Sequence, residues 1–254
     1  MISIRNFFDN PNVEQVAGMG NVRVYEYKKD MSVHTPGEAM AAYFAEKMNH
    51  RVRQVLIELK GDSYILSAGA MQWTAGNVQI SSDVKGVGDL FSKVLKGSVT
   101  NESAVKPRYT GNGLLMLEPT TKYILLENVA NWNGLVLEDG MFLACAATVS
   151  QNVVSRANFS SAVAGGEGLF NLCLNGQGVA VLESPVPREE LIEINLENDE
   201  VKIDGSMAVC WSQTLNFTVE RSTKSLLGSA ASGEGLVNVY RGTGKILMAP
   251  VRFR

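Results

Sequence analysis

Three glutamates recur at one place in a repeated pattern and are the first candidates for chemistry in this chain. They are Glu102, Glu167 and Glu234, each eight or nine residues ahead of a Gly-x-Gly. Equivalent carboxylates that converge on a threefold axis could hold a hard cation. Because carboxylates are mostly exposed in proteins, we favour solvated glutamates that recur with their unit, and the cation site is the alternative.

The Gly-x-Gly pairs that follow these glutamates invite comparison with phosphate-binding loops. They are Gly111 and Gly113, Gly176 and Gly178, and Gly242 and Gly244. None has a third glycine that opens a helix, and none ends in Gly-Lys-Ser/Thr. We interpret each pair structurally, as a turn or bulge where a Cβ atom would clash. Gly176→Val is therefore expected to cost more stability than Asn216→Val on an exposed strand face.

Residues suited to metal or nucleophilic catalysis are sparse. His34 and His50 are the only histidines, and their separation of 16 residues is not a metal-ligand spacing. The chain has no Gly-x-Ser-x-Gly motif. Glu189 and Glu190 are adjacent, so on a strand they would point to opposite faces. The sequence predicts a protein that is not an enzyme, with no catalytic, cofactor-binding or metal residues and no cofactor.

Nucleic-acid binding would have to depend on aromatic stacking, because the net charge of −3 gives no general attraction to phosphate. Trp73, Trp132 and Trp211 lie near the first, second and third units and could stack on bases. Burial in a β core is the commoner fate of tryptophan, and we favour it here.

The bulk composition indicates a folded protein with a sizeable core, since 45% of residues are hydrophobic and 19% are charged. No apolar run is long enough to span a bilayer. The N-terminus contains Asp9 and Glu14 and does not have the pattern of a signal peptide. Cys145, Cys173 and Cys210 have no paired spacing, which predicts reduced core thiols in a cytoplasmic protein.

The shared motifs place the candidate residues in three copies of one unit. The first glycines of the pairs are 65 and 66 residues apart, and the glutamate precedes them in each copy. A third element is a strand-like segment interrupted by a turn, at Gly61-Asp62, Asp139-Gly140 and Asn198-Asp199. Those residue types tolerate positive φ, so a tight hairpin is expected at each.

These units predict an all-β fold. Apolar and polar residues alternate from Ile192 to Glu197, a period of two that buries one face of a strand. We expect internally triplicated β-sandwich units in a pseudo-threefold body, with one or two short helices near the N-terminus. The units are expected at residues 55–119, 120–185 and 186–254, as one compact body.

Residues 1–54 form an N-terminal arm with a helix near residues 36–49. Thr35 is suited to the cap, Pro36 to the first turn and Glu38 to a capping box. The Ala- and Met-rich segment that follows is expected to lie on the sheet. A second, shorter helix is expected over Val87 to Leu95, whose apolar residues fall on one side.

Several motifs occur between about Val55 and Arg254, namely Gly69-Ala70-Met71, Gly76-Asn77-Val78, Lys93 to Gly97, Asn101-Glu102-Ser103, Gly166 to Phe170, Gly176-Gln177-Gly178 and Gly233-Glu234-Gly235. Together they resemble those of the altered-inheritance-of-mitochondria protein 24 family. The bacterial members are more similar in length to this chain. The resemblance implies a fold similar to the tryptophan RNA-binding attenuator protein, triplicated within one chain. It implies no established catalytic activity and no agreed catalytic residues.

The function expected from this evidence is a non-enzymatic interaction or scaffold protein. A protein partner or self-association is expected, and no membrane span. One alternative is an RNA-binding regulator, by analogy with the attenuator-protein fold, although fold alone does not transfer function. The other is a small-molecule or metal-binding β-barrel.

Overall fold

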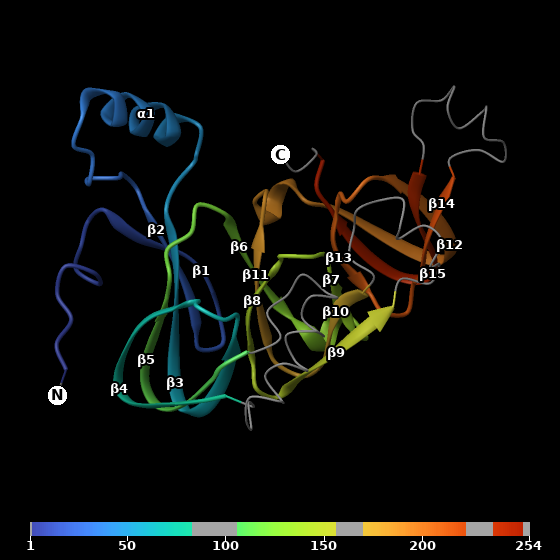
Figure 1. Cartoon of the computed structure of the whole chain (residues 1–254), viewed down its shortest axis with the longest axis horizontal. Coiled ribbons are helices and arrows are strands. Elements are labelled where there is room, and N and C mark those ends of the chain that lie inside the picture. Colours follow the sequence, from blue (N-terminus) through green and yellow to red (C-terminus); the bar gives the residue numbers. More distant parts are fainter. Residues whose placement is uncertain (1, 83–105, 156–169, 222–235, 251–254) are drawn as a thin grey trace, which may run out of the picture.

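Most of the chain is β-strand, arranged in two curled sheets that lie side by side (Figure 1). The computed structural model describes residues 2–82, 106–155, 170–221 and 236–250. The mostly β prediction is confirmed. The expected helix over 87–95 and the three glutamates Glu102, Glu167 and Glu234 fall outside the described residues.

The first sheet contains eight strands among the described residues, each antiparallel to its neighbours. Its main path is β1 (Val13–Met19), β2 (Val22–Tyr27), β3 (Arg53–Leu66), β8 (Phe142–Ala146), β11 (Val179–Ser184) and β6 (Tyr123–Asn128). β5 (Arg108–Leu117) also pairs with β3 and carries β4 (Met71–Ser81). Residues 13–27, within the expected N-terminal arm, are thus an integral part of this sheet.

The second sheet contains seven strands in the described part of the chain. Its main path is β12 (Ile192–Asp204), β15 (Leu236–Met248), β13 (Ala208–Ser212), β7 (Leu135–Leu137), β10 (Phe170–Gly176) and β9 (Val149–Ser155), with β14 (Asn216–Arg221) paired to β15. Two 3-10 turns, Val129–Asn131 and Arg188–Glu190, lie in the connections.

One hydrophobic core joins the sheets. Leu125 and Leu182 of the first sheet pack in the same cluster as Leu174 and Leu247 of the second. Burial of apolar surface on both sides is the main favourable contribution to folding, so this shared cluster ties the two sheets into one body.

The aromatic and sulfur side chains largely fill the core, as expected. Trp132 and Trp211 are buried, and Trp73 is half-buried against a smaller cluster. Cys145, Cys173 and Cys210 are buried and free. Burial raises the pKa of the Cys145 thiol to about 12, so this thiol is protonated and inert at neutral pH.

The first glycine of each Gly-x-Gly pair adopts a positive φ. The angles are 139° at Gly111, 111° at Gly176 and 120° at Gly242, in or at the end of β5, β10 and β15. A Cβ atom on Gly111 would lie 2.1 Å from the Asn77 carbonyl oxygen. The backbone of the neighbouring strand therefore leaves no room for a side chain.

Matching hydrogen bonds accompany two of these pairs. The Thr148 hydroxyl donates to the Gln177 carbonyl at 2.6 Å, and the Thr214 hydroxyl donates to the Thr243 carbonyl at 2.7 Å. The accepting carbonyl is the middle residue of Gly-x-Gly each time.

The three units contribute differently to the sheets. Strands of residues 55–119 lie in the first sheet and those of 186–254 in the second, whereas residues 120–185 supply β6, β8 and β11 to one and β7, β9 and β10 to the other. The threefold repeat and its pseudo-threefold axis therefore stay predictions.

None of the three expected hairpins forms. Gly61 and Asn198 have positive φ, but they lie inside the continuous strands β3 and β12. The pairing register shifts there, between Lys60 and Ser63 and between Leu196 and Asp199. A residue with positive φ serves equally well in a bulge, which bends a strand without reversing it. Asp139-Gly140 does connect two strands, β7 and β8, but these lie in different sheets and do not pair, so this turn is not a hairpin either.

The N-terminal helix forms where the sequence places it, but its packing differs from the prediction. α1 (Pro36–Lys47) has the Thr35 cap and the reciprocal Glu38 capping box. None of its residues is buried, and it projects beyond the end of β2 (Figure 1). The expectation that it lies on the sheet is wrong, because a hollow lined by short alanine side chains of the helix separates it from the strands.

The glycine geometry predicts a difference between equivalent positions. Gly111→Ala and Gly242→Ala share the cost of a side chain at positive φ, about 1–2 kcal/mol. Only Gly111→Ala also forces a Cβ atom onto a backbone oxygen, since the nearest heavy atom at Gly242 is 3.4 Å away. We expect Gly111→Ala to be more destabilising by at least about 1 kcal/mol in urea unfolding. Equal midpoints for the two variants would contradict this.

Candidate functional site

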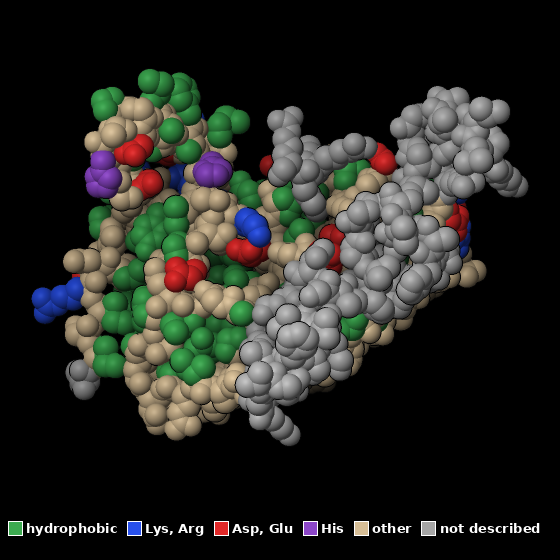
Figure 2. All heavy atoms as spheres, in the orientation of Figure 1, with side chains coloured by type: hydrophobic (Ala, Val, Ile, Leu, Met, Phe, Trp, Pro, Cys, Tyr) green, Lys and Arg blue, Asp and Glu red, His purple; other side chains and the backbone are tan. Residues whose placement is uncertain are grey.

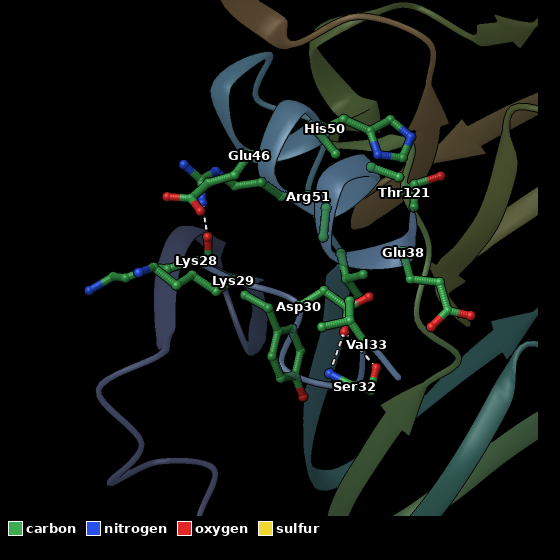
Figure 3. Close-up of a pocket in the computed structure, with 15 residues that line it drawn as sticks. Lys28, Lys29, Asp30, Ser32, Val33, Glu38, Glu46, His50, Arg51 and Thr121 are labelled. Atoms are coloured by element: carbon green, nitrogen blue, oxygen red, sulfur yellow. Dashed lines mark hydrogen bonds between the residues drawn. The ribbon is translucent and has the colours of Figure 1, made fainter. Parts of the chain in front are cut away.

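A hollow lies beneath α1, where the helix stands away from the strands (Figure 3). Its volume is about 450 Å³. The body contributes Tyr27, Lys29, Asp30, His50, Arg51 and Thr121 to its walls. The close-up shows His50 and Thr121 at one end and Glu46 with Arg51 at the other.

The inner side of α1 is made of small and acidic residues. Glu38, Ala41, Ala42, Ala45 and Glu46 line the hollow. Alanine side chains are too short to reach the strands. The helix therefore leaves space below it instead of a packed contact.

Most charged groups around this hollow already have partners. Glu26 accepts from Arg51 at 3.2 Å, and Arg51 also donates to the Lys28 carbonyl. Asp30 accepts from the backbone and the hydroxyl of Ser32. These contacts order the segment between β2 and α1, so the groups serve structure.

Arg53 anchors the floor beneath the hollow. Its side chain is 3% exposed and lies 2.8 Å from a Glu26 carboxylate oxygen. The guanidinium carbon lies 4.0 Å from the centre of the Tyr123 ring. It also donates to the carbonyls of Arg51 and Thr121. This buried cation joins β2, β3 and the start of β6.

The predicted site residues are not brought together at this hollow. Within the described ranges, no three His, Cys, Asp or Glu side chains are grouped so as to hold a metal ion. His50 lines the hollow, whereas His34 precedes the helix and its backbone N–H donates to Glu38. The six glycines of the Gly-x-Gly pairs do not line this hollow, and the glutamates before them lie outside the described residues.

The outer side of α1 carries the large apolar side chains. Met40, Tyr43, Phe44 and Met48 at its C-terminal cap are 61%, 56%, 59% and 77% exposed. We call these four residues the outer face of α1. Figure 2 shows hydrophobic side chains along the outside of this helix. The helix is inverted relative to an ordinary surface helix, whose apolar side faces the core.

This outer face is not among the features predicted from the sequence, although the spacing of its residues is visible in the sequence. Positions 40, 43, 44 and 48 have the i, i+3, i+4, i+8 spacing of one helix face, and alanines occupy 41, 42 and 45. The spacing predicts an apolar face. It does not say whether that face points inward or outward.

A second hollow of about 840 Å³ adjoins the first across the 28–33 segment. Its walls include Pro11, Tyr27, Met31, Val52 and Pro119. We call this hollow the groove. Its polar floor is already ordered, because the Tyr27 hydroxyl donates to Gln54 at 2.7 Å and Gln54 donates to Gln72 at 2.8 Å. An apolar wall over a few fixed polar groups is typical of a binding surface.

Comparison with known proteins places the chain among bacterial relatives. A sequence model of the mitochondrial biogenesis AIM24 family matches residues 45–251. An uncharacterized protein of Streptococcus pyogenes serotype M6 is 28% identical over 193 residues, which cover 73% of this chain and 76% of that protein. A crystal structure of another Streptococcus pyogenes protein has a TM-score of 0.59 at 26% identity, and covers 80% of this chain and 89% of that one.

Part of the site lies outside that family match. The first 44 residues, which include β1, β2 and most of α1, precede it.

In the described residues, no helix has the length and apolar character needed to cross a bilayer.

Breaking the Arg53 contact is expected to destabilise the protein strongly. Arg53→Met removes the closer of the two partners of Glu26 at a largely buried position, while Arg51 still pairs with Glu26, so we expect a cost of about 2 kcal/mol. Lys28→Met is the matched control, because the Lys28–Glu14 pair is half exposed and contributes about 1 kcal/mol at most. Urea unfolding of both variants checks this, and a similar loss in the two would contradict it.

Hydrogen bonds from the backbone N–H groups of His34 and Thr35 hold the pKa of the Glu38 carboxyl below its ordinary value. A carboxyl with a lowered pKa adds stability above its unfolded pKa of about 4.3, and this is lost as pH falls through the lowered value. We therefore expect amide exchange of α1, corrected for the intrinsic rate, to accelerate below about pH 4.

Glu38→Gln is the control for this pH dependence, because glutamine keeps the capping geometry and does not titrate. Its α1 exchange should not show the acid-dependent acceleration. Identical pH profiles for the two proteins would exclude Glu38 as the titrating group.

Proposed function

The chain belongs to the mitochondrial biogenesis AIM24 family, and from that premise we propose that it is a non-enzymatic interaction protein. The family description names a biological process and no reaction. The proposed recognition element is α1, and the proposed ligand is another protein. The observation that carries the proposal is the inverted packing of this helix.

An exposed apolar helix face needs a reason, because large apolar side chains are ordinarily removed from water. Single exposed residues are common, but contiguous apolar patches on a soluble protein mark interaction sites. The outer face of α1 places two Met and two aromatic side chains together on two turns of helix. These are residue types enriched at protein interfaces.

The spacing of the outer face matches a known mode of recognition. Helices that insert into a partner's groove use anchors at i, i+3, i+4 and i+7, and position i+8 lies on the same side of a helix. Met40, Tyr43, Phe44 and Met48 have this spacing. The capping box adds to the fit, because a helix ordered before binding loses less entropy on association.

A membrane surface fits this helix less well than a protein does. Interfacial helices carry Lys and Arg on the polar side. The inner side of α1 carries Glu38 and Glu46 instead. Anionic headgroups would repel these carboxylates.

The burial of two of the three tryptophans weakens the stacking argument for RNA binding. Trp132 and Trp211 are buried in the core, so neither ring can stack on a base without unfolding. Filter binding in about 50 mM salt checks this, because a phosphate-driven complex must be strong there and weaken as salt rises. We expect no retention of RNA.

Photo-cross-linking tests the proposed function directly. A photoreactive phenylalanine analogue at Tyr43, on the outer face, should form protein adducts in cells. Phe44→Asp in the same chain should abolish them, since it places a charge among the anchors. The matched control carries the analogue at Val153, which is 57% exposed on β9. No adducts at Tyr43, or equal adducts at both positions, would overturn the proposal.

A further inference from the structure

We propose that the partner of α1 is a second copy of this chain, and that the outer face of each copy docks into the groove of the other. This inference rests on the proposed function and identifies its partner. The molecule carries both surfaces of a helix-in-groove contact, because the outer face of α1 and the groove are exposed in the same part of the body.

The two halves cannot meet within one molecule. No residue of α1 lines the groove. The side of the helix that faces the body is the alanine side, which lines the smaller hollow. The outer face therefore points away from its own groove, and only another molecule can bring the two together.

The groove has a composition suited to Met and aromatic anchors. Pro11, Met31 and Pro119 form an exposed apolar wall, and Tyr27 and Val52 are half-buried behind it. Met31 is 77% exposed, so the wall itself lacks cover within the described molecule. Both surfaces would lose exposed apolar area in the same contact.

The helix and the groove carry one pair of opposite charges, Lys47 and Asp30, and Lys29 also lines the groove. Lys47 lies on the outer side of α1, where its amine is 5.3 Å from the centre of the Tyr43 ring. Asp30 lines the groove and accepts from Ser32, which fixes its carboxylate at the rim. Docking would bring Lys47 of one copy towards Asp30 of the other.

Interface area favours two contacts over one. A stable interface buries about 800 Å² on each partner. The outer face is only two turns of helix long, which is too little for one stable contact. In a twofold dimer each copy contributes its helix and its groove, so the buried area doubles.

Sedimentation velocity across a concentration series of the full chain tests the proposal. The wild-type chain should convert from monomer to dimer as concentration rises. Phe44→Asp on the helix and Met31→Lys in the groove should each raise the dimer dissociation constant at least about tenfold. Val153→Asp, an equally exposed site on β9, is the matched control and should leave it unchanged.

Mixing the two variants distinguishes a reciprocal contact from other dimers. A mixed dimer of Phe44→Asp and Met31→Lys keeps one unaltered helix-in-groove contact, whereas each variant alone keeps none. The mixture should therefore dimerise more tightly than either variant by itself. A dimer built by pairing two α1 helices predicts no such recovery, and its absence would overturn the proposal.

Other results separate this inference from the proposed function. The wild-type chain could stay monomeric and yet form Tyr43 adducts whose mass differs from that of a dimer. That result would overturn the proposal that the partner is a second copy, and it would leave the proposed function standing. A monomer that co-sediments with vesicles of phosphatidylcholine and phosphatidylserine would overturn both the dimer and the proposed recognition of a protein, provided that Phe44→Asp abolishes the co-sedimentation. The ligand of α1 would then be a lipid surface. Adducts of twice the chain mass, joining Tyr43 to peptides that contain Met31 or Pro119, support the reciprocal contact.

Discussion

The close passage of backbone at the Gly-x-Gly pairs is the constraint on which the rest of this fold depends. At Gly111 the carbonyl of Asn77 occupies the place of a Cβ atom. At Gly176 and Gly178 the chain leaves β10 of the second sheet and enters β11 of the first. Only a residue without a side chain allows strands to bend and cross at this distance.

The shared core follows from that crossing. Because residues 120–185 alternate between the sheets, their apolar side chains face both, and one cluster includes residues from each sheet. The other two units then extend the sheets on either side. In such a body the strands bury the apolar surface of the core among themselves, so no helix is needed to cover a sheet face.

Because the strands bury the core without a helix, α1 is available for another purpose. Arg53 and its contacts hold the adjoining strands together, and the Thr35–Glu38 capping box orders the helix locally. The helix is therefore ordered without being buried, and its small residues leave hollows beside it. A rigid body that presents an ordered apolar helix is suited to recognition, while the described residues hold no cluster suited to metal chemistry.

The sequence by itself determined the β class, the helix with its cap, the burial of the three cysteines and the burial of most tryptophan, because each depends on local pattern or composition. Bulges were mistaken for hairpins at Gly61 and Asn198, since positive φ is a local requirement that both structures satisfy. The division of strands between two sheets, and the direction in which α1 presents Tyr43 and Phe44, were decided by tertiary structure alone. Periodicity defines which residues share a face, but only the packing of distant strands decides whether that face meets the core or water.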